Sequence, residues 1–141
     1  MMGKINLARV ILGGIVAGFV MNIGEFILNG KILAVDWEAA MRSLNRNSIS
    51  EHEILVFVIM TFVLGIMAVW LYAAIRPRFG PGPKTAICAG LVVWFFVGLY
   101  TCVGYWVMNL FPSRILTLGI LWSVLEIPIG TLAGAWLYKE P

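Results

Sequence analysis

The chain has 141 residues, of which 61% are hydrophobic and only 12% are charged. Soluble domains carry roughly twice this share of charged side chains, so water is excluded as the main solvent of the protein surface. The net charge is +3, without the basic stripe that marks a nucleic-acid-binding protein. The two cysteines and the single histidine have no metal-ligand spacing, so neither a metal site nor a cofactor is expected.

Four apolar windows are each long enough to cross a bilayer, which takes about 20 residues. The predicted spans cover about 8–30, 54–75, 85–108 and 115–138. Backbone groups in lipid must hydrogen-bond within their own segment, and no window alternates like a barrel strand, so the spans are predicted to be helices. The predicted fold is an all-α integral membrane protein, a single four-transmembrane-helix bundle over residues 1–141.

The connection after the first span is predicted to carry a short interfacial helix over about 36–45. Asp36 is a favourable N-cap residue, and Trp37 would anchor the helix at the membrane surface. At the start of the second span, Ser50 and Glu53 have the spacing of a capping box.

The connection from Arg76 to Lys84 holds three prolines and two glycines, which predict a non-helical turn. Positive residues favour the cytoplasmic side of a membrane, and the end that includes this turn holds six of the ten. These six are Lys4, Arg9, Arg76, Arg78, Lys84 and Lys139, against Lys31, Arg42, Arg46 and Arg114 at the other end. Both termini are therefore predicted to be cytoplasmic. Arg76, Arg78 and Lys84 are candidate lipid-headgroup ligands, although ordinary anchoring explains them equally well.

Two acidic residues, Glu25 and Glu126, lie inside predicted spans. A carboxylate in hydrocarbon costs at least ~2.5 kcal/mol, so both should face protein or water. Glu126 lies near the middle of its span and is expected to be protonated, because burial disfavours the charged form. Glu25 is nearer the end of its span, where an ionised carboxylate would reach Lys31.

Each acid belongs to a stripe of small and polar residues on one face of its helix, a pattern that lets membrane helices approach closely. The stripes are Gly14, Gly18, Asn22, Glu25 and Asn29 in the first span, and Gly119, Ser123, Glu126, Gly130 and Gly134 in the fourth. Matching the depths of two antiparallel helices from their flanking charges pairs Gly14 with Gly134, Gly18 with Gly130, Asn22 with Glu126, and Glu25 with Ser123. The predicted polar site is therefore Asn22, Glu25, Ser123 and Glu126, beside four packing glycines.

Two stretches, NIGEFILNG at 22–30 and AIRPRFGPGPKTA at 74–86, resemble small four-helix bacterial inner-membrane proteins that have no known activity. The resemblance implies a compact bundle of bacterial origin in the inner (cell) membrane. It supplies no functional residue.

No catalytic motif is present, so an enzyme is not expected. The first hypothesis is a self-associating or accessory membrane subunit, a homo-oligomer or part of a larger complex, that contacts lipid and is held by a carboxyl–amide contact between its first and fourth helices. The alternative is a small oligomeric transporter or channel in which Glu126 and Glu25 handle protons or ions. Acids that line a water-filled cavity would favour transport, and dry, fully bonded acids would favour packing.

Overall fold

A computed structural model describes residues 4–141, and within this range the protein is all-helical, with no β-strand. Its elements are α1 (Leu7–Ile27), η1 (Leu28–Ile32), α2 (Ala34–Ser43), α3 (Glu51–Phe79), α4 (Pro83–Trp94), η2 (Phe95–Tyr100), α5 (Thr101–Val107) and α6 (Ser113–Trp136). The two η elements are π-helical turns that continue a longer helix.

Four helical units in the described part are long and apolar enough to cross a membrane: Leu7–Ile32, Glu51–Phe79, Pro83–Val107 and Ser113–Trp136. The prediction of an all-helical chain with four such helices is confirmed. The second helix is longer than its predicted span because α3 continues through Pro77 to Phe79.

The turn between α3 and α4 is shorter than the predicted non-helical segment and is confined to residues 80–82. Gly80 and Gly82 adopt positive φ angles of 84° and 122°, which glycine tolerates without strain. Pro83 occupies the first position of α4, where a missing N–H costs nothing.

The capping box predicted at the start of α3 is present, since Ser50 and Glu53 bond each other's backbone N–H groups. The N-cap predicted at Asp36 is wrong. Helix α2 begins at Ala34, so Asp36 lies in its first turn, and the Asp36 carboxylate accepts two hydrogen bonds from Arg114 at 2.7 and 2.9 Å.

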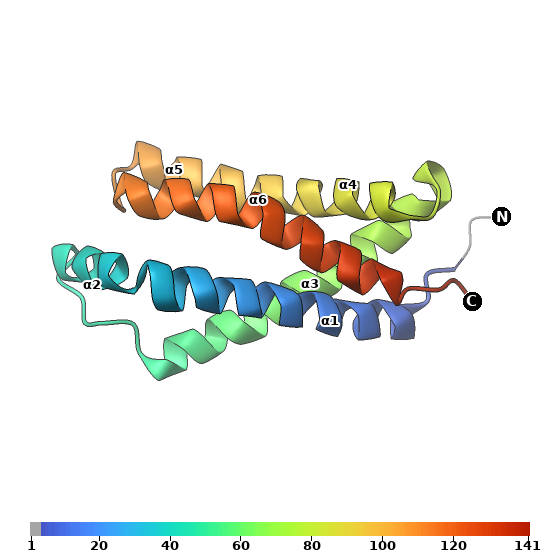
Figure 1. The fold of residues 1–141 in the computed structure, drawn as a ribbon, viewed down its shortest axis with the longest axis horizontal. Helices are drawn as coiled ribbons and strands as arrows, with labels where there is room; N and C mark the ends of the chain where they lie inside the picture. The colour runs from blue at the N-terminus through green and yellow to red at the C-terminus, as the bar shows by residue number, and fades with distance from the viewer. Residues whose placement is uncertain (1–3) are drawn as a thin grey trace.

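Helix α1 packs against both α3 and α6, and these two helices also contact each other. Helices α1 and α6 run antiparallel, and α1 begins at the end of the bundle where α6 stops (Figure 1). Helix α6 also packs against α4, so the third apolar unit lies on the side of α6 away from α1. Small side chains such as Ala17, Ala68 and Ala89 are completely buried in the core, which is possible because the helices approach closely.

The glycine pairing predicted between the first and fourth spans is wrong, because α1 is rotated about its axis by one residue relative to the prediction. A Cβ atom on Gly13 would overlap the carbonyl oxygen of Gly134, so these two glycines make the close contact between α1 and α6. An ideal Cβ atom on Gly130 would lie 3.1 Å from the carbonyl oxygen of Ala17.

Gly14 and Gly18, predicted to face the fourth span, pack on α3 instead. An ideal Cβ on Gly18 would lie 2.7 Å from the Phe62 Cα, and one on Gly65 would lie 2.5 Å from the Gly18 nitrogen. Helix α1 therefore has glycine on two adjacent faces, one toward α6 and one toward α3.

Candidate functional site

The Glu126 carboxyl group is packed directly against the backbone of α1. Only 9% of Glu126 is exposed, and a Cβ atom on Gly24 would overlap the Glu126 Oε2. One turn earlier on α6, Trp122 donates its indole N–H to the same oxygen at 2.8 Å. The absence of a side chain at Gly24 thus leaves the space in which Glu126 reaches α1.

Glu25 and Glu126 meet each other between these two helices. Their carboxyl groups lie in hydrogen-bonding contact, and Glu25 also accepts a hydrogen bond from the Asn29 side-chain amide. An ionised carboxylate is only an acceptor, so a hydrogen bond between two carboxyl groups requires a proton on one of them. A hydrogen bond between Glu25 and Glu126 would therefore require that the pair hold one proton.

The polar contacts continue from this acid pair toward the end of α1. Asn29 lies in the π-helical turn η1, and its Oδ1 accepts a hydrogen bond of 2.9 Å from the Trp37 indole N–H of α2. Trp122, Glu126, Glu25, Asn29 and Trp37 thus form one hydrogen-bonded chain across α6, α1, η1 and α2. We refer to these five residues as the polar chain. A π-helical turn is rare, and such turns occur frequently at functional sites.

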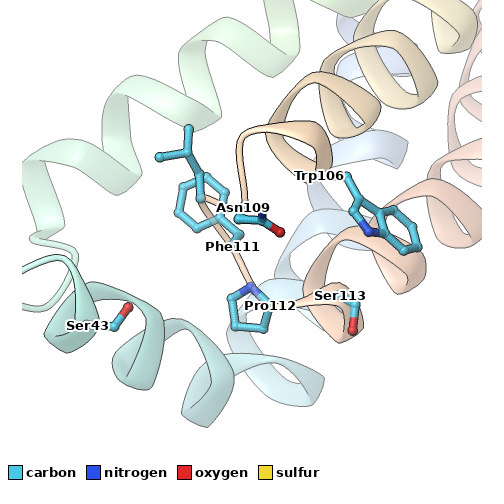
Figure 2. A pocket seen from close by; sticks show the side chains of 7 residues that line it. Ser43, Trp106, Asn109, Phe111, Pro112 and Ser113 are labelled. Carbon is cyan, nitrogen blue, oxygen red and sulfur yellow. The ribbon is translucent and has the colours of Figure 1, made fainter.

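Helix α2 is also held from the other side, by the connection between α5 and α6. The Asp36–Arg114 pair joins α2 to the start of α6, and the Trp37 ring meets the Phe111 ring edge-on at a centroid distance of 5.4 Å. Figure 2 shows the hollow beside this junction, with Ser43 on one side and the residues of the α5–α6 connection on the other. This hollow of about 410 Å³ is lined by Ser43, Trp106 and residues 109–113, and by neither acid.

The four polar residues predicted as one site are divided by the structure. Glu25 and Glu126 come together, although each was predicted to face a different partner. Asn22 faces α3, where its amide donates to the carbonyl oxygens of Gly18 at 3.0 Å and Val58 at 3.3 Å. Ser123 faces the third apolar unit, since its hydroxyl donates to the Ile120 carbonyl and lies against Gly98 of η2.

The expected ion pair between Glu25 and Lys31 is absent, because the Lys31 ammonium lies over the Phe26 ring, 5.4 Å from its centroid. Sequence reasoning also missed Trp122 and Trp37 as partners of the polar residues. The spacing of Trp122, four residues before Glu126, was a usable signal, because residues four apart are neighbours on a helix.

The three candidate lipid-headgroup residues differ in whether a carboxylate of the protein already pairs with them. Arg76 forms an ion pair of 2.8 Å with Glu140, and its guanidinium lies over the Tyr138 ring at 5.6 Å. Arg78 and Lys84 are exposed, and neither has a carboxylate partner within the part of the chain that the structure describes.

Comparisons with protein-family models, with curated proteins and with solved structures found no match. The site is therefore interpreted from its own geometry. Residues 4–141 contain no group of three His, Cys, Asp or Glu side chains that would hold a metal ion. What the polar chain offers chemically is a pair of adjoining carboxyl groups, each of which also accepts a hydrogen bond from a neighbouring side chain.

Proposed function

We propose that this chain is a multi-pass bacterial inner-membrane protein that acts as a self-associating or accessory membrane subunit. The contact between Glu25 and Glu126 holds α1 on α6 within the subunit. The end of the bundle that holds six of the ten Lys and Arg residues lies in the cytoplasm with both termini. The protein is not an enzyme. Insertion is supported by the four apolar helices and by their large exposed apolar surfaces.

The observation that carries the subunit role is the exposure of the first half of α3. Ile54, Leu55, Val56 and Phe57 are four consecutive apolar residues, and each is between 46% and 65% exposed. Successive residues of a helix point about 100° apart, so this half of α3 is uncovered on nearly every side. Figure 1 shows this segment diverging from the other helices near its junction with the α2–α3 connection. A second copy of the chain, or a partner helix, would cover it.

This role predicts a specific cross-link between copies of the chain. In a background in which Cys88 and Cys102 are replaced by serine, Phe57→Cys is expected to give a dimer when membranes are treated with a thiol cross-linker. Phe19→Cys is the matched control, because Phe19 is likewise an exposed phenylalanine, at 60%, but belongs to α1.

Alkaline carbonate extraction of the same membranes tests insertion separately, since an integral protein stays in the pellet. A chain that stays in the membrane but gives no cross-link at position 57, or equal cross-linking at 19 and 57, would contradict self-association through α3. Solubilisation by carbonate would contradict the membrane proposal itself. Pull-down of the native chain in mild detergent then separates a homo-oligomer from an accessory subunit of a larger complex.

A second candidate function is proton or ion handling by an oligomer, and the contact between the two carboxyl groups favours it. The polar chain leads from Glu126 to Trp37, at the end of the bundle where α2 lies. Glu126 is only 9% exposed and Glu25 is partly buried, and the hollow of Figure 2 is lined by neither acid. For that reason the subunit role stands first.

Proton flux into vesicles that contain the purified protein tests this second function. If the acid pair carries protons, Glu126→Gln should reduce dye-reported flux to the level of empty vesicles, because an amide does not exchange a proton in this way. Glu38→Gln is the control, since Glu38 forms an exposed i,i+4 pair with Arg42 on α2. Equal flux in the wild type and in Glu126→Gln would remove proton handling by Glu126 from consideration.

A further inference from the structure

The two ends of the bundle differ sharply in charge. At the end where α2 lies, four basic residues are matched by four acids, Asp36, Glu38, Glu51 and Glu53, and three ion pairs form there. At the opposite end six basic residues face a single acid, Glu140, which pairs with Arg76. An excess of exposed Lys and Arg is therefore confined to one end, where an anionic headgroup would meet no competing carboxylate except the one that Arg76 already occupies.

An apolar groove of about 480 Å³ opens at this same basic end. One wall is the start of α4 with the preceding turn, including Pro83 and Ala86, together with Tyr72 of α3. The other wall is the last part of α6, and includes Leu132, Ala133 and Trp136. Trp136 is 87% exposed, so the protein itself leaves this wall uncovered.

The wall at the α3–α4 turn is held in place by hydrogen bonds. The Gly82 N–H donates to the Tyr72 hydroxyl at 3.3 Å, and the Thr85 hydroxyl donates to the Gly80 carbonyl oxygen at 2.7 Å. Tyr72 in turn packs edge-on against Tyr138. The groove is thus formed before any ligand binds, and the exposed Lys84 follows directly after the lining residue Pro83.

We propose that this groove binds one acyl chain of an anionic phospholipid, whose phosphate lies at Lys84. The groove is apolar, and its one hydroxyl, on Tyr72, already accepts from Gly82. An acyl chain needs no hydrogen bonds, whereas a peptide segment would leave backbone groups unpaired there. A Lys or Arg near an anionic lipid surface contributes about 1 kcal/mol. The proposal rests on the membrane insertion proposed above and names one lipid class and one site.

Native mass spectrometry of the full chain in mild detergent tests this lipid site, with dioleoylphosphatidylglycerol and dioleoylphosphatidylcholine as probes. The wild type should retain more phosphatidylglycerol. Lys84→Gln should weaken phosphatidylglycerol retention about five-fold, the equivalent of one such Lys contact, and leave phosphatidylcholine unchanged. Ala133→Phe, which fills the groove, should weaken both lipids. Lys31→Gln removes one charge at the opposite end and should change neither.

Equal weakening by Lys84→Gln and Lys31→Gln would overturn the site, because the effect would then be one of overall charge. Unchanged retention in Ala133→Phe would overturn the groove as the acyl-chain site. Trp136→Ala is a second groove variant whose folding is not in question, since its side chain is exposed, and it should also weaken both lipids. Carbonate extraction of each variant separates the two proposals: unchanged phosphatidylglycerol retention in Lys84→Gln with the chain still integral contradicts only the lipid site, whereas release of the chain by carbonate contradicts the membrane proposal.

Discussion

Replacing Gly134 by alanine is expected to separate α1 from α6 and to lower the free energy of unfolding by about 1–3 kcal/mol, the usual cost of inserting atoms into a packed core. The new methyl group would overlap the carbonyl oxygen of Gly13, and would lie 2.7 Å from the Val69 Cγ2 and 2.9 Å from the Ala17 Cβ. The first of these atoms belongs to helix backbone. It therefore moves only if the whole of α1 moves.

Gly104→Ala is the matched control for this substitution, because an ideal Cβ on Gly104 meets no atom within 4 Å. Alanine is favoured over glycine in a helix by about 1 kcal/mol, so Gly104→Ala should be neutral or stabilising. Unfolding of both variants by a denaturing detergent, followed by circular dichroism, gives the comparison. Equal stability of the two variants would show that α1 and α6 do not touch at Gly13 and Gly134.

The four apolar helices and the capping box at Ser50 were predictable because each depends on a local pattern in the sequence. The depth at which α1 meets α6 was nearly predictable as well: flanking charges paired Gly14 with Gly134, and the structure pairs Gly13 with Gly134. The rotation of α1 about its own axis was not predictable. Adjacent glycines at positions 13 and 14 supply a small surface on two faces of α1, and a single stripe does not reveal that α1 packs against both α3 and α6.

The acid pair shows a different limit of sequence reasoning. Glu25 and Glu126 were recognised as unusual because a carboxyl group inside an apolar helix is costly. Their contact with each other was not foreseen, since matching the depths of the two helices set Asn22 beside Glu126 and Ser123 beside Glu25. Asn22 and Ser123 lie on the same faces in sequence, yet bond toward α3 and within α6. The position of Asn29 depends on the π-helical turn η1, which no residue pattern in the sequence marks.

Replacing Glu126 by alanine is the substitution expected to damage the site most. It removes the acceptor of the Trp122 N–H and the partner of Glu25 together, and it leaves an empty volume over Gly24. An unpaired buried polar group costs about 1–3 kcal/mol, so the free energy of unfolding should fall by at least that amount. Glu38→Ala is the control, because its partner Arg42 is exposed and the pair contributes little.

Glu126→Gln separates the hydrogen bond from the proton. Its amide N–H donates to Glu25 and its oxygen still accepts from Trp122, so the stability of the bundle should stay close to that of the wild type. If Glu126→Gln were as unstable as Glu126→Ala, hydrogen bonding of the pair would not be what holds α1 on α6. A stable Glu126→Gln that keeps the cross-link at position 57 and has the same proton flux as the wild type assigns the acid pair to packing, because the contact then works without the Glu126 proton. A stable Glu126→Gln that has lost proton flux assigns the pair to proton handling, because only the exchangeable proton distinguishes it from the wild type.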